Sequence, residues 1–147
     1  MKRYEFNLGA ALRVRKLQEG MAKSSLQKAN MAAAASEMQA QRSLAHYEDV
    51  TNETGPSWME QAERAHLAAQ AAIEARQSLA AARAAATTAM GQYVEANKAV
   101  SVLGHLDERR REEHAAAVQH EEMTAIDDLV TSRHVRRQDH LNKKGRH

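Results

Sequence analysis

Apolar residues recur every three or four positions along two long stretches of the chain, which is the spacing of one face of an α-helix. The first stretch, about residues 8–51, contains no Pro, and Asn7 is placed to cap it. Its main apolar line consists of Val14, Leu17, Met21, Met31, Ala35, Met38 and Ala45. Ser24, Lys28 and Arg42 interrupt that line. An alternative line on the same helix consists of Leu26, Ala29, Ala33, Ala40, Leu44 and Tyr47.

Residues 52–56 predict a turn, because they combine small polar residues with Gly55 and the only Pro, Pro56. Ser57-x-x-Glu60 then has the form of a capping box, so a second helix is expected at about 57–137 with a basic tail at 138–147. Its seven-residue repeat is carried by Ala62, Ala65, Ala69, Ala72, Arg76, Leu79, Arg83, Ala86, Met90, Tyr93, Asn97 and Val100. A strict heptad repeat with Ala at most positions predicts a coiled coil whose helices approach closely.

A connection this short makes the two helices antiparallel. A turn near residue 54 aligns residue i with about 108 − i, so about residues 101–137 would have no partner helix in the chain. Gly91 and Gly104 lie inside the second helix and each costs about 1 kcal/mol relative to Ala. Three explanations for these glycines are open: a hinge, simple tolerance of the cost, or a close backbone contact between Gly91 and Gly20.

Composition supports an all-α fold: aromatic residues make up 3% of the chain, and Ala dominates its 43% hydrophobic content. Ala buries little area, so the core should be thin. The chain has no Cys, which excludes disulfides and thiolate zinc sites. No apolar segment of a signal peptide follows Met1-Lys2-Arg3, and no long apolar run occurs later. We therefore expect a soluble, cytoplasmic protein.

Charge is distributed unevenly along the chain. Residues 1–28 carry seven Lys and Arg and two acids, net +5; residues 133–147 carry six against one, also +5; the remainder carries net −8. Such asymmetry points to partners rather than to fold, although a solvated surface with frayed basic ends would look the same. The basic ends could contact nucleic acid weakly, but the acidic middle and the scarcity of aromatic residues argue against it.

No enzymatic or metal chemistry is expected. Glu63-x-x-His66 places two ligand types on one helical face, but a di-iron site needs two such motifs and further glutamates from four helices. No phosphate-binding loop, nucleophile elbow or catalytic triad pattern occurs. We therefore expect no catalytic residue, no metal and no cofactor.

Two groups of residues near the ends of the predicted helices are candidates for partner binding. Arg13, Arg15 and Lys16 form a basic cluster that could bind through charge. Met123, Ile126 and Val130 follow i, i+3, i+7 spacing, with Leu129 beside them, in the part of the second helix predicted to lack a partner. These four residues, called the distal stripe below, are therefore predicted to form a docking surface unless a shifted hairpin register covers them.

Several short motifs resemble those of the FliJ family of flagellar protein-export factors. At the N-terminus these are Tyr4-x-Phe6-x-Leu8, Leu12-Arg13-x-Arg15 and Leu17-Gln18-Glu19. Toward the C-terminus they are Leu103-x-x-Leu106, Glu108-Arg109-Arg110-Arg111, Glu121-Glu122, Asp127-Asp128-Leu129 and Arg133. Chain length agrees as well, so the resemblance covers essentially the whole sequence.

The resemblance implies a long antiparallel coiled coil that is similar to the shaft of the γ subunit of rotary ATPases. It implies a role in flagellar type III export, with three partners: the hexameric export ATPase, the cytoplasmic domain of the export gate membrane protein, and export chaperones. The protein would then associate peripherally with the inner membrane export apparatus. The terminal end, with Arg13, Arg15, Lys16 and the stripe, would bind the ATPase. Leu44, Tyr47, Ala72 and Ile73 match positions associated with gate contact.

Ala65, Ala69 and Arg76 stand where relatives can carry bulkier apolar residues, so the gate-contact set differs in detail. Virulence-type secretion systems contain counterparts with the same architecture. A purely structural coiled-coil spacer fits the periodicity equally well, and a weak nucleic-acid-binding protein is the remaining alternative.

Overall fold

The computed structural model describes residues 3–55 and 57–145. These form two helices, α1 (Gly9–Asn52) and α2 (Trp58–Lys144), with 44 and 87 residues respectively, and the described residues contain no strand. The predicted all-α hairpin with a longer second helix is thus confirmed. Pro56 of the predicted turn, and Lys2 and Arg146 of the predicted basic ends, lie outside the described residues.

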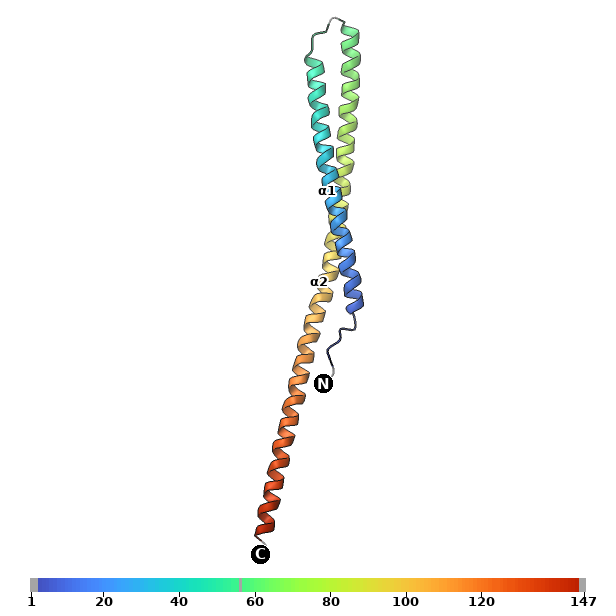
Figure 1. Ribbon diagram of the computed structural model, residues 1–147. Helices are drawn as coiled ribbons and strands as arrows, with labels where there is room; N and C mark the ends of the chain where they lie inside the picture. Colours follow the sequence, from blue (N-terminus) through green and yellow to red (C-terminus); the bar gives the residue numbers. More distant parts are fainter. Residues whose placement is uncertain (1–2, 56, 146–147) are drawn as a thin grey trace. The chain divides into compact units, whose positions relative to one another are not determined.

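The chain divides into two compact units, which are treated separately. Residues 11–101 form the hairpin unit, in which α1 and the first half of α2 lie side by side (Figure 1). Two pairs of side chains link the helices there: the Asn97 amide donates to Glu19 over 2.8 Å, and Arg83 forms an ion pair with Glu37 at 3.4 Å. Residues 3–10 and 102–145 form the terminal unit.

The core of the hairpin unit is thin, as the composition predicts. Its buried apolar residues are Val50, Ala68, Ala75 and Ala89. In α1 the residues turned toward α2 are spaced alternately by three and four, and they are Glu19, Ala22, Leu26, Ala29, Ala33, Ser36, Ala40, Ser43, Tyr47 and Val50. Small side chains at most of these positions let the two backbones approach closely.

The main apolar line predicted for α1 is wrong, because all of its members are exposed. The alternative line is correct for five of its six residues; Leu44 is 51% exposed, and the neighbouring Ser43 takes its place. The physical reason lies in the interruptions. Packing the main line against α2 would have placed the charged groups of Lys28 and Arg42 in the interface, where they would lose hydration.

The predicted line of α2 is half correct. Ala65, Ala72, Leu79, Ala86, Tyr93 and Val100 are all partly buried against α1. The other half lies one residue earlier than predicted, at Ala68, Ala75, Ala82, Ala89 and Ala96. Of the positions expected instead, only Ala69 is partly buried, and Ala62, Arg76, Arg83, Met90 and Asn97 are exposed. A line of Ala at every seventh position buries no charge, whereas the predicted line would have buried two arginines.

The turn is closed by side chains that follow it in sequence. Gln61 donates its amide N–H to the carbonyl of Glu53, and Arg64 forms an ion pair with the Glu53 carboxylate at 2.7 Å. Ser57 precedes α2, and its carbonyl accepts the N–H of Gln61 at 3.1 Å, as expected of a residue in the cap position. The predicted reciprocal side-chain bonds between Ser57 and Glu60 are absent from the described residues, so the capping box is not formed.

These contacts also correct the register. The alignment predicted from the turn places Arg64 opposite residue 44 and Asn97 opposite residue 11, but their partners are Glu53 and Glu19. The shift is eight or nine residues at these two contacts and twelve at the Arg83–Glu37 ion pair. It arises because Glu53, the residue after α1, lies beside the second turn of α2. The first turn of α2 therefore extends beyond the end of α1.

In the terminal unit, α2 continues to Lys144 instead of ending near Arg137, so most of the predicted tail is helical. The reason is that no Gly or Pro occurs between these residues, and Gly145 is the first helix-breaking residue beyond them. At the other end, the N–H of Gly9 donates to the carbonyl of Phe6 at 2.9 Å. This turn starts α1 two residues after Asn7, and Asn7 makes no capping side-chain bond in the described residues, contrary to prediction.

The glycines of α2 do not break it. The helix is continuous through Gly91 and Gly104, and the boundary between the two units lies between them, after residue 101. A Cβ added at Gly20 or Gly91 would meet no atom within 4 Å. The predicted close contact between these two glycines is therefore wrong, and the hinge stays a prediction.

Candidate partner-binding surfaces

The terminal unit contains a cluster of side chains around Tyr4. The Tyr4 hydroxyl donates to the carboxylate of Asp107 at 2.6 Å, and it also lies 3.2 Å from the Asp107 carbonyl. The Arg111 guanidinium lies 5.5 Å from the centre of the Tyr4 ring and forms an ion pair with Asp107 at 3.1 Å. The His114 ring meets the Tyr4 ring edge to face, with centroids 5.5 Å apart.

The electrostatics of this cluster keep the Tyr4 hydroxyl protonated, so that it can donate its hydrogen bond to Asp107. Partial burial raises the pKa of Tyr4, and the hydrogen bond to Asp107 raises it further, so the hydroxyl keeps the proton that it donates. The bond to Asp107 also raises the pKa of Arg111. The extended residues before α1 are thus held against α2 by a hydrogen bond, a cation–π contact and an aromatic contact. Sequence reasoning identified Tyr4 and Arg111 only as parts of separate motifs.

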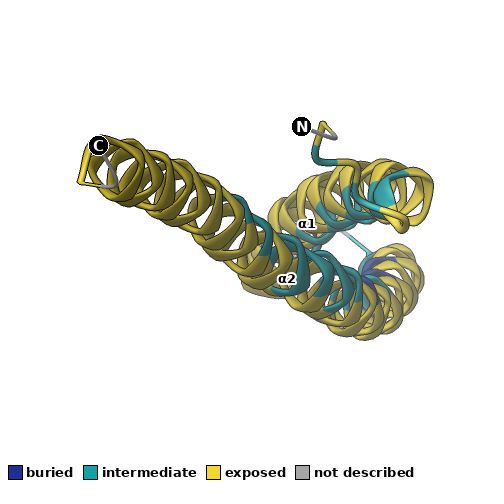
Figure 2. Cartoon of the chain, turned by 90° about the horizontal axis from the view of Figure 1, so that it is seen from below, coloured by how far each residue is buried: buried dark blue, intermediate teal, exposed yellow. Residues whose placement is uncertain are grey.

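The distal stripe is exposed. Met123, Ile126, Leu129 and Val130 are 65%, 59%, 63% and 60% exposed, and every described residue from 119 to 145 is exposed (Figure 2). The hairpin register is indeed shifted, but the shift does not cover the stripe.

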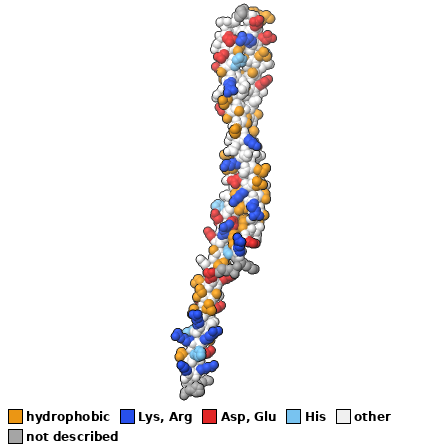
Figure 3. Space-filling view, viewed as in Figure 1, with side chains coloured by type: hydrophobic (Ala, Val, Ile, Leu, Met, Phe, Trp, Pro, Cys, Tyr) orange, Lys and Arg blue, Asp and Glu red, His pale blue; other side chains and the backbone are white. Residues whose placement is uncertain are grey.

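The continued helix extends this surface in a way that the sequence prediction missed. Arg133, Arg137 and Lys144 lie on the same helical face as Ile126 and Val130, because successive steps of three, four and seven residues return to one side of a helix. Asp128 and Asp139 fall on the other side, and Asp127 borders the face beside Met123. The face is therefore apolar over 123–130 and basic over 133–144; Figure 3 shows Lys and Arg gathered on the last turns of α2.

The basic cluster near the start of α1 is only partly contiguous. Arg13 and Lys16 are three residues apart and share a face, and both are exposed. Arg15 lies about 200° around the helix from Arg13 at the usual 3.6 residues per turn, and it donates to Gln18 at 3.2 Å. The three residues predicted as one site thus occupy two faces of α1.

A shallow groove of about 200 Å³ runs between the helices of the hairpin unit. Its lining residues are Glu37, Ala40, Gln41, Leu44, Ala72, Arg76 and Leu79. Of the predicted gate residues, Leu44 and Ala72 line this groove, Tyr47 packs in the seam, and Ile73 is 56% exposed beside it. Arg76 and Leu79, which also line the groove, belong to the heptad line predicted for α2 but were not named as gate-binding residues.

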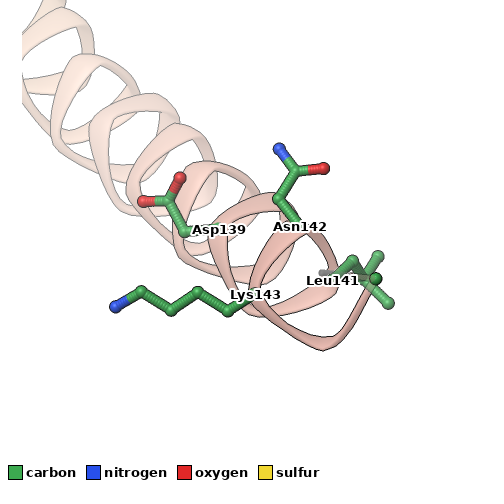
Figure 4. A pocket seen from close by; sticks show the side chains of 5 residues that line it. Asp139, Leu141, Asn142 and Lys143 are labelled. Atoms are coloured by element: carbon green, nitrogen blue, oxygen red, sulfur yellow. The ribbon is translucent and has the colours of Figure 1, made fainter. Parts of the chain in front are cut away.

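The described residues offer little that could hold a small ligand. Around the last turns of α2, Asp139, Leu141, Asn142 and Lys143 line a concavity, but all four come from one helix and point in different directions (Figure 4). Within the described ranges, no three His, Cys, Asp or Glu side chains are grouped to bind a metal ion. Neither described helix has an apolar stretch of the length that crossing a bilayer requires.

Comparisons with known proteins add no relative: no family model, no curated protein and no solved structure matches this chain. Function must therefore be inferred from the surfaces themselves and from the motif resemblance.

Proposed function

We propose that this chain is a non-enzymatic component of the flagellar type III export apparatus, which couples the export ATPase to the export gate and assists chaperone and substrate handling. One observation carries the proposal. Tyr4, from the N-terminal motif that resembles the FliJ family, contacts Arg111 of the similar arginine-rich motif and Asp107 just before that motif. Residues that the resemblance lists separately, about a hundred positions apart, thus form one cluster.

In this proposal the terminal unit and Arg13, Arg15 and Lys16 at the start of α1 bind the ATPase, and the rest of the hairpin unit binds the gate. The exposed stripe provides an apolar contact, and Arg133, Arg137 and Lys144 continue the same face with positive charge. Exposed apolar helix faces of this kind commonly dock into grooves of a partner protein. The groove lined by Leu44 and Ala72 is the corresponding gate surface. The long hairpin itself fits a protein that links two partners.

A pull-down with the purified export ATPase and the gate cytoplasmic domain tests the proposal. Ile126→Asp with Val130→Asp should abolish ATPase binding while gate binding persists. Val135→Asp is the matched control, because Val135 is 51% exposed on the opposite face of the same segment. Far-UV circular dichroism should show unchanged helicity in both variants.

Two results would contradict the proposal. If the wild-type chain binds neither partner, the assignment to export is wrong. If the double variant instead melts at a much lower temperature than the Val135 variant, the stripe packs within the protein and is not a docking surface.

A further inference from the structure

Helix α1 carries a second heptad line on the side turned away from α2. This outer line consists of Val14, Leu17, Met21, Ser24, Lys28, Met31, Ala35, Met38, Arg42 and Ala45. Its large apolar members are more than half exposed: Val14 53%, Leu17 66%, Met21 63%, Met31 73% and Met38 54%. The inner line of the same helix is mostly Ala and Ser. Thus α1 packs mostly small residues against α2, with Leu26, Tyr47 and Val50 as the exceptions, and leaves most of its large apolar residues exposed.

This distribution is typical of a helix that packs on two sides. A solvated helix face has no reason to repeat apolar residues at steps of three and four over some thirty residues, whereas a coiled-coil partner requires that repeat. Single exposed apolar residues are normal, but seven apolar residues on one line, interrupted only by Ser24, Lys28 and Arg42, indicate a contact surface. The outer line lies entirely within the hairpin unit.

The charges in the line restrict how a second helix could pack there. In a parallel pair of α1 helices, Lys28 would face Lys28 and Arg42 would face Arg42, which is unfavourable. Consider instead an antiparallel pair whose two-fold axis passes midway between Lys28 and Met31. Residue i of one copy then faces residue 59 − i of the other copy. Lys28 then faces Met31, and Arg42 faces Leu17. The pair thus contains two Lys and two Arg, which lower its stability but restrict its register. Their long aliphatic stems let the charged ends reach water at the edge of the contact.

The remaining positions of the antiparallel pair match. Met21 faces Met38, Val14 faces Ala45, and Ser24 faces Ala35, so apolar or small residues meet in all three layers. The line is therefore complementary to itself, which is the condition for a two-fold symmetric contact between identical chains.

Charge along α1 supports the same orientation. Residues 13–28 carry five Lys and Arg and one Glu, whereas residues 37–52 carry three Asp and Glu and one Arg, and of these acids Glu37 is paired with Arg83 of α2. An antiparallel pair places the basic half of one helix beside the acidic half of the other. At the edge of the line, Arg13 of one copy lies next to Glu48 of the other, and both side chains are exposed. Flanking pairs of this kind set orientation in coiled coils.

We propose that the outer line of α1 is a self-association surface, through which two copies of this chain pair antiparallel. The proposal rests on the outer line alone and goes beyond the export function, since it holds whichever larger assembly the protein serves.

Sedimentation equilibrium of the full chain tests this proposal directly. The apparent mass should rise with concentration from 16.3 kDa toward twice that value. Met21→Glu with Met38→Glu places two carboxylates against each other in every copy and should hold the protein at the monomer mass. Met21→Glu with Met38→Lys instead places opposite charges together in the antiparallel pair and should restore the dimer. In a parallel pair, that second variant would place like charges together and stay monomeric.

Leu67→Glu is the matched control, because Leu67 is 60% exposed on α2, outside the outer line. Its mass should follow that of the wild type, and helicity by circular dichroism should be equal in all variants. The proposal is overturned if the wild type stays at 16.3 kDa at every concentration, if Leu67→Glu alone removes the dimer, or if the opposite-charge variant fails to pair. A monomer that binds only an acidic helix of another protein would also overturn it.

Discussion

Replacing Ala89 with Leu tests the most basic structural statement, which is that α1 and α2 approach closely along a line of Ala. Ala89 is 8% exposed and belongs to the seven-residue Ala repeat of α2. Three added carbons have no space in a seam of small side chains, so they must force the helices apart or take strained rotamers. Overpacking of this kind costs about 1–3 kcal/mol.

Thermal unfolding followed by circular dichroism measures this cost. For a chain of this length, 1 kcal/mol lowers the melting temperature by about 2–4 °C, so Ala89→Leu should lower it by about 2–12 °C. Ala85→Leu provides the matched control, because Ala85 is exposed on the same helix one turn earlier. Ala and Leu have nearly equal helix propensities, so the control should melt close to the wild type.

The result that would refute this reasoning is equal melting of the two variants, or a higher melting temperature for Ala89→Leu. Either outcome would mean that residue 89 does not face α1 at close range.

Met90→Ala gives an independent check on the phase of the repeat. Met90 is 50% exposed, so its truncation should cost less than the 2–5 kcal/mol expected of a buried Met.

Two further predictions follow from local geometry. Gly91→Ala and Gly104→Ala should each stabilise α2 by about 1 kcal/mol in thermal unfolding, because an added Cβ meets no atom within 4 Å; a loss of stability would indicate strain there. Tyr4→Phe should lower the protection of the amides of residues 3–8 against hydrogen exchange, measured relative to an unfolded chain at the same pH. The contribution of Tyr4 should also be lost at alkaline pH: because its pKa is raised, the contribution is present below the ordinary value near 10 and disappears as pH rises through the folded-state value. Equal protection in the wild type and Tyr4→Phe at neutral pH would show that the Tyr4 contacts do not hold this segment.

The helices and their antiparallel arrangement could be predicted from sequence because they depend on local patterns. Heptad spacing, the near absence of Gly and Pro, and one compact group of turn residues leave few other folds. The phase of the seam was harder to predict. In α2, Ala occupies both members of the neighbouring positions 68 and 69, so hydrophobicity alone cannot choose between them. Arg76 and Arg83 decide the choice seven and fourteen residues later, because burying them would leave charges without water.

The register and the Tyr4 cluster could not be predicted because each depends on contacts between distant residues. The estimate of the register assumed that the helices start level with each other. Instead, the turn residue Glu53 bonds Gln61 and Arg64, which moves the alignment by about two helical turns. Likewise, nothing in the sequence around Tyr4 indicates that its partner is Asp107; only the fold brings the two together.

Lys28 and Arg42, which interrupt the line that was predicted to face α2, also explain why the two sides of α1 differ in the size of their apolar residues. Lys28 and Arg42 exclude the line of large apolar residues from the intramolecular seam, since neither charge finds a partner among the Ala side chains of α2. Ala, Ser and Leu26 pack there instead and allow close approach, at a modest gain per residue because Ala buries little area. The large residues Leu17, Met21 and Met31 are thereby left outside with the two charges that exclude them. A second helix on that outer face would cover these large side chains, while the long stems of Lys28 and Arg42 let their charged ends reach water at the edge of the contact.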